Sequence, residues 1–125
     1  MGYWNKRKKA FGYAFQGIAE LFKKESHAQI DFIATVCVIL AGLLLNLERW
    51  EWCAIIVCIG GVLMGEGMNT AIERLCDRVS MERHPLIKAA KDIAAGAVLL
   101  FVIAAIIVGS LIFIPHIISL FVEIN

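Results

Sequence analysis

The chain has 125 residues, of which 60% are hydrophobic and 18% are charged, and its mean hydropathy is +0.77. A soluble domain is typically about 45–50% apolar and about 25% charged, and a chain this short cannot bury such an apolar excess in one core. The same composition excludes an intrinsically disordered chain, and the net charge of +1 gives no reason to expect a nucleic acid partner. We therefore interpret the sequence as a small all-α integral membrane protein with a single domain, residues 1–125.

The N-terminal part of the chain, residues 1–25, predicts an amphipathic helix at the membrane surface. Phe11, Phe15, Ile18 and Phe22 recur at spacings of four, three and four residues, so they share one helical face. Lysine residues occupy much of the remaining surface, as in helices that lie in the membrane interface. We expect this helix to lie on the cytoplasmic surface, and a role as a simple anchor is left open.

Three apolar stretches predict transmembrane helices at about residues 29–47, 52–76 and 86–114. The second of these helices must carry Glu66 into the membrane to reach the roughly 20 residues that a span needs. The third stretch is longer than one span requires, and we expect Pro115 to kink or end its helix.

The positions of the lysine and arginine residues predict the orientation of the spans. Six basic residues precede the first span and five lie between Arg74, near the end of the second span, and Lys91, whereas only Arg49 lies between the first two spans, beside Trp50 and Trp52. The positive-inside rule then places the N-terminus and the loop at 78–91 in the cytoplasm, and the C-terminus on the outer face.

The most informative polar residues lie near the cytoplasmic end of the second span. At about 100° per residue, four of them share a helical face about 80° wide: Glu66, Asn69, Glu73 and Asp77. An ionisable residue in a bilayer costs on the order of 3 kcal/mol, so this face predicts a functional site. Arg74 and Arg78 could neutralise part of it, which leaves a structural ion-pair network open, but Glu66 has no basic residue one turn away in its own helix.

The residue types on this face suit two kinds of chemistry. Carboxylates and an amide can bind Mg²⁺, and one carboxylate can act as a general base on a hydroxyl. A proton or cation pathway would use the same residue types. Lys91 and Asp92, at the start of the third span, favour the first kind, because a lysine charge suits phosphate oxygens and not a cation pathway. Glu25, where the surface helix joins the first span, is expected at the depth of Glu73, so these two carboxylates could bind one metal ion.

Two motifs resemble those of a known family. The stretch E-G-M-N-T-A-I-E-R-L-C-D, residues 66–77, resembles the signature E-x-x-N-[ST]-A-I-E-x-x-x-D of the prokaryotic diacylglycerol kinase and undecaprenol kinase family. The stretch H-P-L-I-K-A-A-K-D-I-A-A-G-A-V-L, residues 84–99, resembles its second signature, and the helix arrangement extends the resemblance over essentially the whole chain. The resemblance implies a homotrimeric lipid kinase of the bacterial cytoplasmic (inner) membrane that uses ATP and Mg²⁺.

The resemblance also implies roles for individual residues. Glu66 would be the general base, supported by Asn69, and Glu25 and Glu73 would bind the metal ion. The residues implied to bind the nucleotide and its metal are Lys6, Tyr13, Glu25, Glu73, Asp77, Glu82, Arg83, His84, Lys91 and Asp92. Those implied to contact the lipid are Phe15, Gln29, Glu66 and Ala95.

Two local differences bear on the choice of lipid. Gln29 and Asp31 stand where many undecaprenol kinase-like members have a basic residue and a histidine, within E-x-N-x-R-I-H. The A-A-G-A stretch at 94–97, in contrast, matches undecaprenol kinases better than the G-S-A-A that diacylglycerol kinases tend to have. We expect conversion of undecaprenol to undecaprenyl phosphate. The alternatives are conversion of diacylglycerol to phosphatidic acid by the same mechanism and, from other classes, a small oligomeric transporter or proton-coupled channel, or a non-catalytic membrane anchor or partner subunit.

Overall fold

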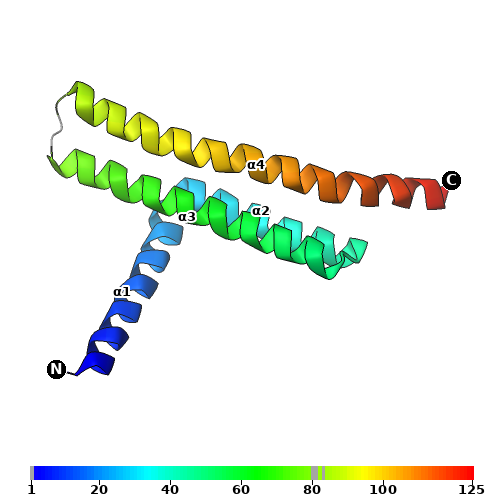
Figure 1. Cartoon of the computed structure of the whole chain (residues 1–125), viewed down its shortest axis with the longest axis horizontal. Helices are drawn as coiled ribbons and strands as arrows, with labels where there is room; N and C mark the ends of the chain where they lie inside the picture. The colour runs from blue at the N-terminus through cyan, green and yellow to red at the C-terminus, as the bar shows by residue number, and fades with distance from the viewer. Residues whose placement is uncertain (1, 80–81, 83) are drawn as a thin grey trace. The chain divides into compact units, whose positions relative to one another are not determined.

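The structure is a computed structural model that describes residues 2–79, 82 and 84–125. Within these residues the chain forms four helices, α1 (Tyr3–Lys24), α2 (Ser26–Leu45), α3 (Arg49–Val79) and α4 (Pro85–Ile124) (Figure 1). Three of them, α2, α3 and α4, are long and apolar enough to cross a membrane. The expected all-helical membrane fold with three spans is confirmed at this level. The chain divides into two compact units, one up to Ala34 and the other Thr35–Asn125.

Helix α1 keeps both of its faces exposed. None of its residues, all of which the structure describes, is buried, and the large side chains of Trp4, Phe11 and Phe15 are exposed. The helix ends where Glu25 adopts an extended backbone, although the Glu25 N–H still donates to the Leu21 carbonyl. An exposed apolar face on a lysine-rich helix is typical of interfacial helices. The position of α1 on a membrane surface stays a prediction.

A tight turn connects α2 to α3. Asn46 adopts a left-handed backbone with φ of 53°, a conformation that asparagine tolerates better than most residues, and α2 ends there. The Glu51 carboxylate then accepts a hydrogen bond from the Glu48 N–H at 2.9 Å, which satisfies one of the donors left free at the start of α3.

Helices α3 and α4 pack against each other in antiparallel directions (Figure 1). Near the α2–α3 turn the contact is a small apolar cluster built on Leu47, Ile55 and Ile112. Further along, the ring of Phe101 occupies the space beside Gly61, where no Cβ would fit without a shift. The α3–α4 pair is the element that carries most of the predicted site.

Pro115 does not end α4, which continues to Ile124 over 40 residues. A proline inside a helix removes one backbone N–H, but membrane helices tolerate this because neighbouring groups can satisfy the carbonyl that is left. Of the two outcomes expected at Pro115, an end of the helix is therefore wrong, and a kink stays a prediction.

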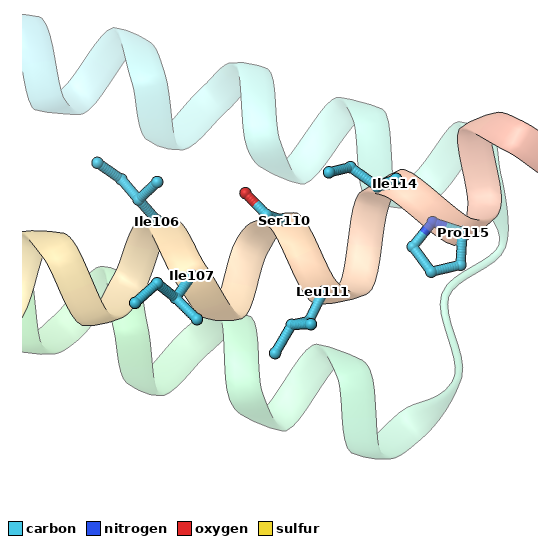
Figure 2. Close-up of a pocket in the computed structure, with 6 residues that line it drawn as sticks. All are labelled: Ile106, Ile107, Ser110, Leu111, Ile114 and Pro115. Atoms are coloured by element: carbon cyan, nitrogen blue, oxygen red, sulfur yellow. The ribbon is translucent and has the colours of Figure 1, made fainter.

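A shallow groove of about 340 Å³ runs along α4 beside this proline (Figure 2). Two rows of residues at four-residue spacing line it: Ile106, Ser110 and Ile114, and Ile107, Leu111 and Pro115. Apart from the Ser110 hydroxyl the lining side chains are apolar, so the groove offers no charged group for chemistry on a phosphate.

Candidate active site

The polar face predicted for the second span lies on one uninterrupted helix. Glu66, Asn69, Glu73 and Asp77 all belong to α3, so their spacing sets them along one side of it. Glu66 and Asn69 are half-buried, whereas Glu73 and Asp77 are exposed. The Asn69 side-chain amide donates a hydrogen bond to Glu73 Oε1 at 3.3 Å, which links two members of the face one helical turn apart.

Two oxygens on this face are buried but not satisfied. Among the residues that the structure describes, neither Glu66 Oε2 nor Asn69 Oδ1 has a hydrogen-bond partner. A buried polar atom without a partner costs free energy, and such atoms in native structures typically mark functional positions or sites for water or ions. These oxygens are therefore positioned to accept a proton, a hydrogen bond or a cation from a ligand.

The second helix contributes a cation to this end of the structure. Lys91 Nζ lies 2.5 Å from Asp77 Oδ1, so an ion pair joins α4 to the last turns of α3. Both side chains keep part of their surface exposed. The structure thus brings together two of the residues predicted to bind the nucleotide. We call Asp77 and Lys91 the site-end pair.

Asp92, the acidic residue predicted at the start of the third span, pairs along its own helix. Lys88 Nζ lies 2.6 Å from Asp92 Oδ2, and both side chains are more than half exposed. Exposed pairs of this kind contribute little to stability, because water screens the two charges. Asp92 can therefore exchange this partner for a ligand at little cost.

The remaining predicted residues near the start of α4 are His84, Ala95, Glu82 and Arg83. His84 is the N-cap of α4, and its Nδ1 accepts a hydrogen bond from the Leu86 N–H at 3.1 Å. Ala95 is exposed one turn after Lys91, and Glu82 is exposed in the connection before α4. Arg83 lies outside the described residues.

The other predicted residues belong to the first unit of the chain. Lys6, Tyr13 and Phe15 are exposed on α1, and Glu25 is half-buried between α1 and α2. Gln29 donates a hydrogen bond from its side-chain amide to the Lys23 carbonyl at 3.1 Å. A meeting of these residues with the polar face of α3 stays a prediction.

The oxygen-rich face of α3 fits a hard divalent cation such as Mg²⁺. Within the described residues, no three His, Cys, Asp or Glu side chains are grouped closely enough to hold a metal ion by themselves. Mg²⁺ needs no such cage, because it is usually held by one or two carboxylates together with substrate phosphates and water. The two unsatisfied oxygens and the exposed Glu73 carboxylate are donors of the required kind.

Sequence reasoning missed one polar contact between the two helices. Glu51, in the first turn of α3, is buried, and both of its carboxylate oxygens lie 3.0 Å from Nε2 of His116 on α4. In the sequence Glu51 stands between Trp50 and Trp52, where a charged residue at the membrane interface is ordinary. His116 directly follows Pro115, a residue expected to kink or end the helix. No local motif signals the pair, because its partners are 65 residues apart.

Comparison with known proteins identifies the family. Residues 12–113 match the family described as prokaryotic diacylglycerol kinase. The chain is 43% identical over 107 residues to the undecaprenol kinase of Bacillus subtilis, which covers 86% of this chain and 87% of that protein. It is 40% identical over 114 residues to the diacylglycerol kinase of Synechocystis, a match that covers 90% of this chain and 65% of that protein. It is 38% identical over 88 residues to the diacylglycerol kinase of Pseudomonas aeruginosa, a match that covers 70% of this chain and 72% of that protein. These matches confirm the resemblance that the two motifs indicated, and the chain belongs to the prokaryotic diacylglycerol kinase family.

Proposed function

We propose that this protein is an ATP- and Mg²⁺-dependent lipid kinase that phosphorylates the hydroxyl of a membrane lipid, with undecaprenol as its substrate. The observation that carries the proposal is Glu66, a carboxylate whose buried Oε2 has no hydrogen-bond partner among the described residues. A carboxylate on a helix that can span a membrane, left unsatisfied on a polar face, is suited to accept the proton of a lipid hydroxyl.

In the proposed reaction, Glu66 removes the proton from the lipid hydroxyl. The lipid oxygen then forms a bond to the γ-phosphorus of ATP while the bond to the bridging oxygen breaks, and ADP leaves. Such phosphoryl transfer requires mainly positioning and electrostatic stabilisation from the protein. Asn69 contributes positioning, because its hydrogen bond to Glu73 orients that carboxylate on the same face of α3 as the general base.

The site-end pair suits the phosphate end of the nucleotide. Lys91 offers a compact positive charge to phosphate oxygens, and Asp77 holds the lysine Nζ in place before the nucleotide arrives. Asp92, released from its exposed pair with Lys88, adds a second acidic group at the start of α4. Contacts to the nucleotide from Lys6, Tyr13 and residues 82–84 belong to the same proposal.

Glu25 and Glu73 are the carboxylates proposed to hold Mg²⁺. When bound, this ion neutralises charge on the phosphates during transfer. Glu73 is already oriented by Asn69, and Glu25 lies at the junction of α1 and α2.

The relatives support two candidate lipids. Undecaprenol is favoured because the Bacillus subtilis protein, 43% identical, is named undecaprenol kinase and because residues 94–97 read A-A-G-A. Diacylglycerol is the second candidate, since the Synechocystis and Pseudomonas aeruginosa relatives are named diacylglycerol kinases. Phe15, Gln29 and Ala95 are the proposed lipid contacts beside Glu66.

We also propose the setting of the reaction. The distribution of basic residues favours a cytoplasmic N-terminus, an outer C-terminus and a location in the bacterial cytoplasmic (inner) membrane, with the site at the cytoplasmic interface. A homotrimer is proposed as the working assembly. The family membership favours a kinase over the transporter or channel that the acidic face alone left open.

The test is an assay of the purified protein with labelled ATP and Mg²⁺ against a panel that includes undecaprenol and diacylglycerol. We expect labelled undecaprenyl phosphate as the main product, and we expect Glu66→Gln to abolish phosphorylation of every lipid while the protein still assembles. Glu123→Gln, which removes an exposed carboxylate near the end of α4, is the matched control and should retain activity. Full activity of Glu66→Gln would remove the general-base assignment, and ion flux in liposomes without ATP consumption would favour the transporter.

A further inference from the structure

Glu51 and His116 form a polar contact between a buried carboxylate and a half-buried imidazole, at the end of the α3–α4 pair that lies next to the α2–α3 turn. We call them the loop-end pair. Glu51 is only 6% exposed, and its Oε1 also accepts the hydrogen bond from the Glu48 N–H. Each partner stands one helical turn from the apolar cluster, Glu51 from Ile55 on α3 and His116 from Ile112 on α4. The contact thus closes the packed interface at this end.

The chemistry of the loop-end pair makes it selective for one alignment of the two helices. A buried carboxylate needs its hydrogen-bond partners, and removing one member of such a pair leaves the other uncompensated. Sliding α4 along α3 by one turn would replace His116 opposite Glu51 by Ile112 or Leu120, neither of which can donate a hydrogen bond. Sliding costs an apolar contact some packing, as where the Phe101 ring lies at Gly61, but leaves no hydrogen-bonding group without a partner.

The loop-end pair and the site-end pair specify the same register. In an antiparallel helix pair the residue numbers of facing partners have a nearly constant sum, and the sums for Glu51–His116 and Asp77–Lys91 differ by one. The two contacts lie about 39 Å apart along α3 and about 38 Å apart along α4, at 1.5 Å per residue. Fixing the register at one end therefore fixes which residues face each other at the other end.

We propose that Glu51 and His116 are positioning residues for the nucleotide site, and that they act by holding α3 and α4 in the register that aligns Asp77 with Lys91. This inference rests on the proposed function of Lys91 and Asp77 in binding ATP. Of the two residues, His116 lies beyond the family match, which covers residues 12–113, whereas Glu51 lies within it.

Steady-state kinetics separate positioning from stability. His116→Leu leaves Glu51 buried without its partner, so we expect a lower thermal midpoint and a KM for ATP raised about fivefold or more, with kcat at saturating ATP changed less than about twofold. In His116→Gln a side-chain amide can donate to Glu51, so this variant should restore KM. Glu48→Gln, which removes a nearby exposed carboxylate that bonds to Trp50, is the matched control and should leave KM unchanged.

The double variant Glu51→Leu/His116→Leu is the decisive case. Replacing both members of a buried polar pair by apolar residues leaves no polar group uncompensated, so we expect the double variant to recover the thermal midpoint. Because two leucines do not select the register, its KM for ATP should stay raised. A return of KM to the wild-type value in this double variant would show that the pair serves only stability, and would overturn the proposal.

Alkylation of Cys76 provides a readout that does not depend on kinase activity. Cys76 is half-buried next to Asp77, and it can be the single reactive thiol once Cys37, Cys53 and Cys58 are replaced by alanine. We expect its alkylation rate to rise severalfold in the double variant and to return to the wild-type rate in His116→Gln. An inactive wild-type protein would contradict the proposed function alone, whereas equal alkylation rates in all variants would contradict the register role.

Discussion

Asn69 uses the two ends of its side-chain amide differently. Its NH₂ group donates to Glu73, while its carbonyl oxygen is buried without a hydrogen-bond partner among the described residues. Glu66, three residues earlier, also keeps one carboxylate oxygen unsatisfied. The Asn69 NH₂ group therefore orients the Glu73 carboxylate, while the unsatisfied oxygens of Asn69 and Glu66 remain available as acceptors for a ligand. This division of roles is expected where a cation or a proton must be received.

We expect Glu73→Gln to raise the Mg²⁺ concentration needed for half-maximal activity severalfold. Glutamine keeps the hydrogen bond with Asn69 available but removes the negative charge that attracts the cation. The measurement is a Mg²⁺ titration of lipid phosphorylation at saturating ATP, with Glu123→Gln as the matched loss of a carboxylate. An unchanged Mg²⁺ requirement would argue against Glu73 as a metal ligand.

For single residues, the sequence predicts which of them share one face of a helix but not which of them form contacts between helices. Helical periodicity alone places Glu66, Asn69 and Glu73 on one side of α3, because the angle per residue is fixed. The ion pair of Asp77 with Lys91 depends instead on how α3 and α4 align, and that alignment results from packing along the whole interface. Both residues were predicted for the site without their mutual contact.

The packing of α3 against α4 depends on a close approach at Gly61. The Phe101 ring occupies the volume where a side chain at 61 would begin, whereas nothing lies within 4 Å of the Cβ position at Gly60. At Gly65 the neighbouring Val98 is at ordinary van der Waals distance, 3.5 Å. Of these three glycines, only Gly61 is at a position where the interface requires a residue without a side chain.

We expect Gly61→Ala to lower the stability of the protein by about 1–3 kcal/mol, because the Phe101 ring must move to make room. Gly60→Ala is the matched control, and alanine there should be neutral or slightly stabilising in a helix. The measurement is the thermal midpoint of each variant in one detergent, and Gly61→Ala combined with Phe101→Leu should recover part of the loss. Equal midpoints for the two alanine variants would contradict this account of the packing.

The sequence predicts the number and approximate place of the helices because long apolar stretches have few alternatives in a membrane. It misjudges the end of the last one. A proline in a helix interior removes one hydrogen bond and its ring clashes with the carbonyl four residues earlier, which kinks or breaks the helix. Most residues around Pro115 are apolar, with His116 as the polar exception, so unwinding in a membrane would offer the backbone few new partners, and α4 continues to Ile124.

At the scale of the whole molecule, a single chain covers little of its own apolar surface. Only five apolar residues are buried among those that the structure describes: Ala28, Leu47, Ile55, Ala94 and Ile112. In the most apolar part of each spanning helix, 11% of the residues or fewer are buried. Lipid can cover apolar side chains but not the polar face of α3, and this is the physical argument for the proposed homotrimer, in which other copies of the chain would shield the site.

We expect the detergent-solubilised protein to have a mass three times the 13.8 kDa of one chain, after subtraction of the detergent. The physical reason is that three spans from one chain cannot enclose a polar face, whereas helices from neighbouring copies can. The measurement is light scattering coupled to size-exclusion chromatography, with Glu66→Gln as a variant that should assemble alike. A monomeric mass in an active preparation would contradict the trimer.

The length of α4 has a consequence for the membrane around the protein. Its stretch from Ile93 to Val122 contains no Asp, Glu, Lys or Arg and is about 45 Å long, against a hydrocarbon thickness of about 30 Å. This hydrophobic mismatch must be relieved by tilting the helix, thickening the bilayer or extending its last turns into the headgroups. Because α3 is packed along α4, any tilt inclines the acidic face by the same angle. The thickness of the bilayer therefore sets the angle at which that face meets the membrane surface.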